Sequence, residues 1–179
     1  RDQPTQNDLH SAAVLLFFAM LFDVLDGRIA RLTRTQSAFG LQLDSLADVI
    51  SFGVAPALLV HRWVLHRYEV FGAFAAFLFV ACGAIRLARF NVLNADPKTK
   101  APGRYTVGLP IPPAAGILVS LLVVNQALEG ALGDERYTLP LVLVTFALSA
   151  LMVSTVRFRS FKDLRENRGT MLLVFLGVG

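Results

Sequence analysis

The sequence has little charge and almost no cysteine. Charged residues make up 17% of the 179 positions and hydrophobic residues make up 55%, whereas soluble domains carry about 25% charged residues. This shortage of charge argues against a water-soluble monomer. The only cysteine, Cys82, lies within an apolar run, which excludes an intramolecular disulfide framework, a CxxC redox pair and a cysteine-rich zinc site.

What the sequence does contain is a series of long apolar segments, and its mean hydropathy is +0.58. They cover about residues 9–22, 40–61, 70–85, 107–128 and 137–156, and a further one starts near residue 170. A helix of about 20 residues crosses the roughly 30 Å hydrocarbon core of a membrane. The pattern therefore predicts an all-α, polytopic transmembrane helix bundle with five full spanning helices and part of a sixth.

We expect residues 1–179 to form a single membrane-embedded domain. No internal repeat or low-complexity tract divides the chain. The sequence begins with Arg1 rather than Met and stops at Gly179 inside an apolar run. We therefore expect the domain to be truncated at both ends.

The net charge of +4 and the pI near 9.7 reflect membrane topology better than nucleic-acid binding, because the basic residues lie between the apolar segments. Of the 17 lysines and arginines, 13 fall in the connections 28–39, 86–104 and 157–168, while the remaining four are Arg1, Arg62, Arg67 and Arg136. Loops rich in Lys and Arg stay in the cytoplasm. The distribution predicts that the end of the bundle formed by residues 28–39 faces the cytoplasm.

Four aspartates stand at this predicted cytoplasmic end of the first two segments: Asp23, Asp26, Asp44 and Asp48. Their i,i+3 and i,i+4 spacings place each pair on one side of its own helix. If the two helices pack together, four carboxylates converge and need a counter-charge. The alternative interpretation, in which the acids cap helices or pair with neighbouring arginines, suits a single aspartate better than this arrangement, because membrane acids are rare and usually functional.

The residue types around the aspartates favour a site for divalent cations and a diphosphate. Hard carboxylate oxygens suit Mg²⁺, Mn²⁺ or Ca²⁺. The small residues Gly27, Ala30 and Gly40 allow the helices to approach closely. Arg31, one turn after Gly27, presents a guanidinium that can bind a phosphate with two hydrogen bonds.

The segments DVLDGRIAR (23–31) and GLQLDSLAD (40–48) resemble the signature of the CDP-alcohol phosphotransferase family, D-x2-D-G-x2-A-R-x8-G-x3-D-x3-D, at all eight fixed positions. The stretches SFGVAP (51–56), RLARFN (86–91) and GLPIP (108–112) are similar to those of the bacterial and archaeal phosphatidylserine synthases within that family. The resemblance covers about residues 9–160.

This resemblance implies an activity and a set of roles. The activity is transfer of the phosphatidyl group from CDP-diacylglycerol to the hydroxyl of L-serine, with release of CMP, by a homodimer in the inner membrane of a prokaryotic cell. Two divalent ions, Mg²⁺ or Mn²⁺, are held by Asp23, Asp26, Asp44 and Asp48, of which Asp48 is also the general base. The CDP-diacylglycerol contacts fall on Gly27, Ala30, Arg31, Ser37 and Gly40.

Arg86, Arg89 and Asn91 end the third segment on the same predicted side as the aspartates. They are candidate contacts for the serine carboxylate or a lipid phosphate, although arginines are also expected there as cytoplasmic anchors. Three other functions stay open: a family member that uses glycerol 3-phosphate or inositol phosphate, a divalent-cation transporter, and a family member without activity. We expect membrane lipids as partners, and no nucleic acid.

Overall fold

The computed structural model describes residues 5–33, 38–95 and 105–159 of the chain. The elements in order are α1 (Gln6–Thr33), α2 (Ala38–Asp48), the π-helix η1 (Val49–Val54), α3 (Ala55–Trp63), the 3₁₀ helix η2 (Leu65–Tyr68), α4 (Glu69–Ala95), β1 (Tyr105–Val107), α5 (Ile111–Ala127), the 3₁₀ helix η3 (Ala131–Gly133), α6 (Glu135–Val153) and β2 (Arg157–Arg159). The helical class expected from the sequence is confirmed. The start of a sixth span near residue 170 lies outside the described residues.

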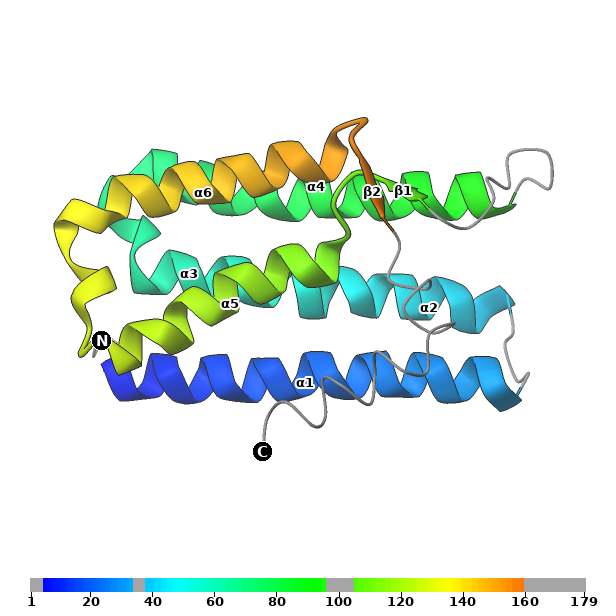
Figure 1. The fold of residues 1–179 in the computed structure, drawn as a ribbon, viewed down its shortest axis with the longest axis horizontal. Helices are drawn as coiled ribbons and strands as arrows, with labels where there is room; N and C mark the ends of the chain where they lie inside the picture. Colours follow the sequence, from blue (N-terminus) through cyan, green and yellow to red (C-terminus); the bar gives the residue numbers. More distant parts are fainter. Residues whose placement is uncertain (1–4, 34–37, 96–104, 160–179) are drawn as a thin grey trace.

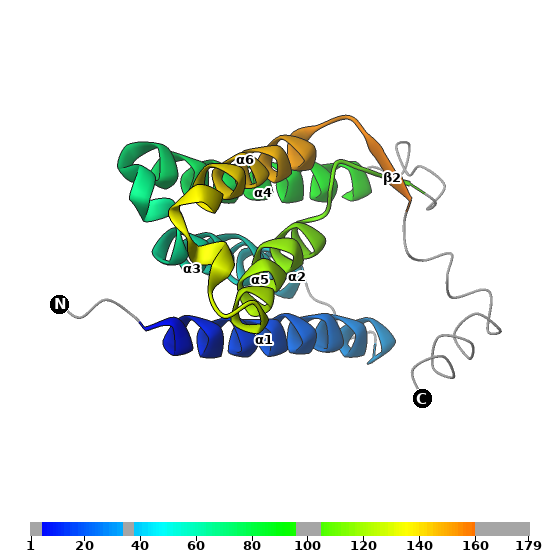
Figure 2. The same cartoon turned by 60° about the vertical axis from the view of Figure 1, so that its left-hand side comes forward.

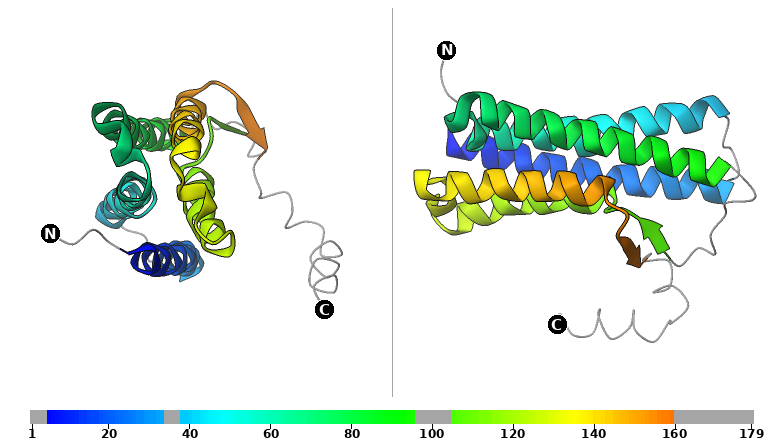
Figure 3. Two further views of the ribbon diagram at one scale, coloured as in Figure 1. Left: turned by 90° about the vertical axis from the view of Figure 1, so that its left-hand side faces the viewer. Right: turned by 90° about the horizontal axis from the view of Figure 1, so that it is seen from above.

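The long helices lie side by side and alternate in direction, with α2, η1 and α3 forming one continuous rod (Figure 1). Helices α4 and α6 pack together at one side of the bundle, α1 lies at the other, and α3 and α5 lie between them, as seen obliquely in Figure 2 and along the bundle in Figure 3 (left). The C-terminal end of α1, the start of α2, the C-terminal end of α4 and the short strands therefore all lie toward the same end of the bundle. This is the end that carries the aspartate motif.

The helices bury one face inside the bundle and expose large apolar side chains on the outer face. Ala75 and Phe79 on α4 are fully buried, while Phe71 and Phe77 on the same helix are largely exposed. An exposed apolar surface of this kind is unfavourable in water and is what a bundle surrounded by lipid presents.

Three stretches of the described chain are long and apolar enough to cross a membrane: Gln42–Trp63, Leu65–Leu93 and Glu135–Val153. The first contains the rod of α2, η1 and α3, and the other two correspond to α4 and α6. Helix α5 is apolar but shorter, at 17 residues. The chain is thus a helical membrane protein, and the number of five spans stays a prediction.

The rod formed by α2, η1 and α3 is a regular α-helix only at its two ends. Between α2 and α3, the backbone N–H of Ala55 bonds to the carbonyl of Ile50, five residues back, which is the π-helical pattern. Phe52 and Gly53 in this π-helix are buried, and η1 contacts α1, α4 and α5. The π-helix therefore anchors the rod at the centre of the bundle, directly after Asp48.

A short two-stranded ribbon adds to the helices. Strands β1 and β2 pair antiparallel, with Thr106 opposite Phe158. Immediately after β1, Gly108 has φ of +77° and its N–H donates to the carbonyl of Val156 at 2.9 Å. Since a Cβ at Gly108 would lie 2.3 Å from the Met152 carbonyl oxygen, this position requires glycine. The ribbon therefore joins the segment that precedes α5 to the segment that follows α6.

Candidate active site

Two acids from separate helices meet at the motif-bearing end. Asp23 lies on α1 and Asp48 is the last residue of α2, and their carboxyl groups are joined by a hydrogen bond. Both are partly buried. Asp44, one turn before Asp48, is exposed and interacts electrostatically with it. One aspartate from each helix, Asp23 and Asp48, is thus brought into contact, and the convergence of all four motif aspartates stays a prediction.

The pairing of Asp23 and Asp48 limits what occupies the space between them. Two carboxylates at hydrogen-bonding distance repel each other unless a proton or a cation lies between them. Carboxylate oxygens are ligands for hard divalent cations, so the donor chemistry fits Mg²⁺ or Mn²⁺. Among the side chains that the structure describes, no group of three or more His, Cys, Asp and Glu is arranged to hold a metal ion. The Asp26 side chain lies outside those described, although its backbone continues α1.

Arg86 approaches the acids from a third helix. It lies on α4 and is only 7% exposed, and its guanidinium stacks over the Phe90 ring at 5.0 Å from the centroid. The charges of Arg86 and Asp48 attract each other. The two residues are nevertheless not joined in an ion pair, and the buried Nε atom of Arg86 has no hydrogen-bond partner within the described part of the chain.

The other two candidates on α4 have different surroundings. Asn91 donates from its side-chain amide to the Ser45 hydroxyl at 2.9 Å, which links α4 to α2 beside Asp44. Arg89 is exposed. The fold therefore gives the three residues different surroundings, which the sequence did not predict. Arg86 is a buried cation, Asn91 forms a hydrogen bond between helices, and Arg89 is a surface cation.

The predicted CDP-diacylglycerol contacts are only partly within the described residues. Gly27, Ala30 and Arg31 belong to the last turns of α1, where the backbone is described and the side chains are not. Ser37 lies outside the described residues. Gly40 is exposed near the start of α2. The roles of these residues stay predictions.

The π-helix is the feature of this site that sequence reasoning missed. The stretch SFGVAP resembled a family motif, and in the structure it covers the end of η1 and the start of α3, with Pro56 in the first turn of α3. An apolar run without charge gives no periodic signal that separates a π-turn from an α-turn. Only Gly53, inside the run, hinted at an irregular helix.

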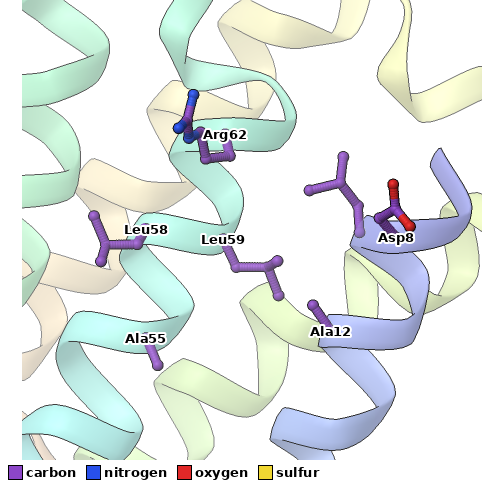
Figure 4. A pocket seen from close by; sticks show the side chains of 7 residues that line it. Asp8, Ala12, Ala55, Leu58, Leu59 and Arg62 are labelled. Atoms are coloured by element: carbon purple, nitrogen blue, oxygen red, sulfur yellow. The ribbon is translucent and has the colours of Figure 1, made fainter. Parts of the chain in front are cut away.

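A groove of about 610 Å³ lies between α1 and α3, at the end of the bundle away from the aspartate pair. It is lined by Asp8, Leu9, Ala12, Ala55, Leu58, Leu59 and Arg62 (Figure 4). Asp8 already accepts hydrogen bonds from the N–H and hydroxyl of Thr5 at 2.9 and 2.7 Å. The groove wall is mostly aliphatic and does not present the carboxylate cluster that the motif predicts.

Residues 5–156 match the sequence profile of a family described as CDP-alcohol phosphatidyltransferase. The chain belongs to the CDP-alcohol phosphatidyltransferase family. It is accordingly a transferase, and the aspartate pair, Arg86 and the π-helix all lie within the part of the chain that matches this family.

Two of the curated relatives that match this chain share one name, and a third has another name. A CDP-diacylglycerol–serine O-phosphatidyltransferase of Helicobacter pylori is 40% identical over 168 residues, which cover 92% of this chain and 67% of that protein. One of Bacillus subtilis is 35% identical over 156 residues, covering 87% of this chain and 78% of the relative. An archaetidylserine synthase of Methanothermobacter thermautotrophicus is 37% identical over 152 residues, covering 84% and 58%.

Proposed function

We propose that the chain transfers the phosphatidyl group from CDP-diacylglycerol to the hydroxyl of L-serine, giving phosphatidylserine and CMP. The observation that carries this proposal is the hydrogen-bonded pair of Asp23 and Asp48 beside the buried Arg86, in a chain whose relatives are named for that reaction.

Asp48 is the group we assign as the proton acceptor. A serine hydroxyl is a weak nucleophile until its proton is removed, and a positioned carboxylate can remove it. The hydroxyl oxygen then forms a bond to the phosphorus that bears the diacylglycerol, while the bond from that phosphorus to the oxygen of CMP breaks. CMP leaves with the bonding electron pair, and the proton is held on Asp48.

The four motif aspartates would together hold two divalent ions, Mg²⁺ or Mn²⁺. When bound, such ions neutralise the charge that develops on the phosphoryl oxygens and the leaving phosphate. Gly27, Ala30, Arg31, Ser37 and Gly40 are the residues we assign to the cytidine diphosphate part of the donor. Glycine and alanine leave the backbone open to a ligand, and the arginine matches a phosphate in charge and shape.

We place this reaction at the cytoplasmic leaflet of a prokaryotic inner membrane, in a homodimer. The donor keeps its acyl chains in lipid while serine arrives from water, so the reacting groups must meet at the membrane interface. The excess of lysine and arginine at the motif-bearing end supports the cytoplasmic side.

The direct test measures CMP release from CDP-diacylglycerol by the protein in detergent with Mg²⁺ or Mn²⁺. L-serine, glycerol 3-phosphate and inositol phosphate are compared as acceptors. We expect release with serine, and release with another acceptor alone would overturn the serine assignment while keeping the aspartate chemistry. The absence of release with every acceptor would favour an inactive homologue or a cation transporter, which flux measurements in vesicles would detect.

Removal of metal provides a separate prediction. Addition of EDTA should reduce serine-dependent CMP release to background, because the paired carboxylates then lack the cations that hold the diphosphate. Excess Mg²⁺ or Mn²⁺ should restore it, and Na⁺ at the same ionic strength controls for non-specific charge effects. Full activity after complete chelation would contradict the assigned role of the aspartates.

A further inference from the structure

Arg86 is a buried cation without a complete set of partners. The residue is 7% exposed and its Nε is unbonded within the described residues, while its guanidinium lies over the Phe90 ring. Burial of an ionised group is costly unless it is paired and hydrogen-bonded. The surroundings of Arg86 are therefore those of a group that awaits an anionic ligand.

The position of Arg86 along the bundle brings this ligand close to the reacting groups. Gly83, one turn earlier on α4, faces Ile111 at the start of α5 and Met152 near the end of α6. Arg86, one turn after Gly83, therefore lies near the level at which α5 begins and α6 ends, toward the motif-bearing end. Arg86 and Asp48 attract each other without forming an ion pair.

We propose that Arg86 binds the carboxylate of the amino-acid acceptor and selects an acceptor that carries this group. This inference rests on the proposed function and extends it from the reaction to the recognition of the acceptor. In serine, two carbon atoms separate the hydroxyl oxygen from the carboxylate carbon, a distance of about 3–4 Å given bonds of about 1.5 Å. A carboxylate held by Arg86 therefore presents its hydroxyl toward Asp48.

The chemistry of the guanidinium matches this assignment. An arginine side chain binds a carboxylate through two parallel hydrogen bonds, and the unbonded Nε supplies one donor of such a pair. Because Asp48 acts as the proton acceptor in the reaction, the acceptor carboxylate supplies the counter-charge for the buried Arg86 guanidinium. Arg89 carries the same charge but is exposed, so it does not share this need for a partner.

The test compares L-serine with serinol, in which the carboxylate is replaced by a hydroxymethyl group while the ammonium and hydroxyl are kept. CMP release with each acceptor is measured for the wild type, Arg86→Gln and the matched surface variant Arg89→Gln. We expect Arg86→Gln to lower kcat/KM for serine by roughly 10- to 100-fold, the range for a lost hydrogen-bonded charge pair. Transfer to serinol should change by less than about threefold, and Arg89→Gln should keep the wild-type preference.

Equal loss with both acceptors would overturn the proposal, because Arg86 would then support the acidic cluster rather than recognise the acceptor. An unchanged serine preference would overturn it as well. If Arg86→Gln does not fold, Arg86→Lys retains the charge without the paired donors, and we expect an intermediate serine preference from it. Saturation-transfer NMR of L-serine, with binding lost in Arg86→Gln and retained in Arg89→Gln, tests recognition independently of turnover.

These outcomes are distinct from a failure of the proposed function. If the wild type releases no CMP with serine, the reaction itself is wrong. If the wild type uses serine and Arg86→Gln discriminates as the wild type does, only the recognition proposal fails.

Discussion

Asp48 joins the two halves of the family motif, because it ends α2 and bonds to Asp23 on α1. Replacement by asparagine keeps the shape and removes both the negative charge and the ability to accept a proton. We expect Asp48→Asn to lower serine-dependent CMP release by about 10²-fold or more, the usual contribution of a positioned base. Asp44→Asn should also reduce release, since it weakens the same negative cluster.

Asp8→Asn is the matched control for these substitutions. Asp8 lies at the other end of α1, where its carboxylate accepts hydrogen bonds from Thr5. These bonds hold the pKa of the Asp8 carboxyl below its ordinary value. Its loss should affect the start of α1 and leave CMP release within roughly twofold of the wild type, an effect typical of surface capping residues. Wild-type turnover in Asp48→Asn would refute the assigned base.

Gly108 carries a prediction about stability rather than chemistry. Its φ of +77° and the 2.3 Å approach that a Cβ would make to the Met152 carbonyl oxygen leave no room for a side chain. Gly108→Ala should destabilise the protein by about 1–3 kcal/mol, the range for a strained backbone residue, measured as a lower melting temperature in detergent. Gly116→Ala is the control, because nothing lies within 4 Å of its added Cβ and alanine favours a helix; an equal loss in both variants would argue against this explanation.

At the scale of elements, the sequence predicts helices better than their ends. The five apolar segments correspond to α1, the rod of α2, η1 and α3, and helices α4, α5 and α6. Helix α1 continues to Thr33 and α4 to Ala95, although the apolar runs that predicted them end at about residues 22 and 85. Arginine is a good helix former, and a helix is extended more easily than it is started, so hydropathy alone stops too early. The three-residue strands were not predictable, because their pairing depends on residues about 50 positions apart.

In the site as well, the sequence predicts the geometry within one helix, whereas the contacts between helices require the fold. The aspartate spacing predicted that each pair lies on one side of its own helix, and the hydrogen bond between Asp23 and Asp48 brings one member of each pair together. The separation of Arg86 from Arg89 required the fold, because both are arginines near the end of the same helix and only one turns into the bundle. Burial of a charged residue depends on its neighbours in space, which a single sequence does not contain.

The π-helix predicts an unusual tolerance to deletion. A π-turn accommodates one extra residue, so removal of Ile50 should convert η1 to an α-helix without changing the direction in which α2 and α3 face. Removal of Leu58 from α3 should rotate the two parts of the rod by about 100° relative to each other. The two side chains are matched in exposure, at 60% and 59%.

We therefore expect the Ile50 deletion to fold and to retain at least about a tenth of the CMP release, and the Leu58 deletion to lose release and lower the melting temperature. Size-exclusion chromatography and thermal unfolding in detergent monitor the fold of both variants. Equal damage from the two deletions would mean that η1 does not act as an accommodated extra residue.

At the scale of the whole molecule, the charge distribution predicts which end faces the cytoplasm. In a Cys82→Ser background, Phe39→Cys marks the motif-bearing end and Asp134→Cys the opposite end, and both native side chains are exposed and lie outside the three spanning stretches. A membrane-impermeant maleimide should label Phe39→Cys in inside-out vesicles and Asp134→Cys in right-side-out vesicles, because positive connections stay inside. The reverse pattern would place the aspartates outside the cell.

Helices α1, α2 and α4, which carry Asp23, Asp48 and Arg86, extend past the ends of α5 and α6 (Figures 1 and 3). A lipid-borne donor would approach there by diffusion within the plane of the membrane rather than from solution. The relevant donor concentration is then its mole fraction in the bilayer or micelle. Dilution of CDP-diacylglycerol with inert lipid, at constant bulk concentration, should slow the enzyme, whereas the same dilution leaves its response to water-borne serine unchanged.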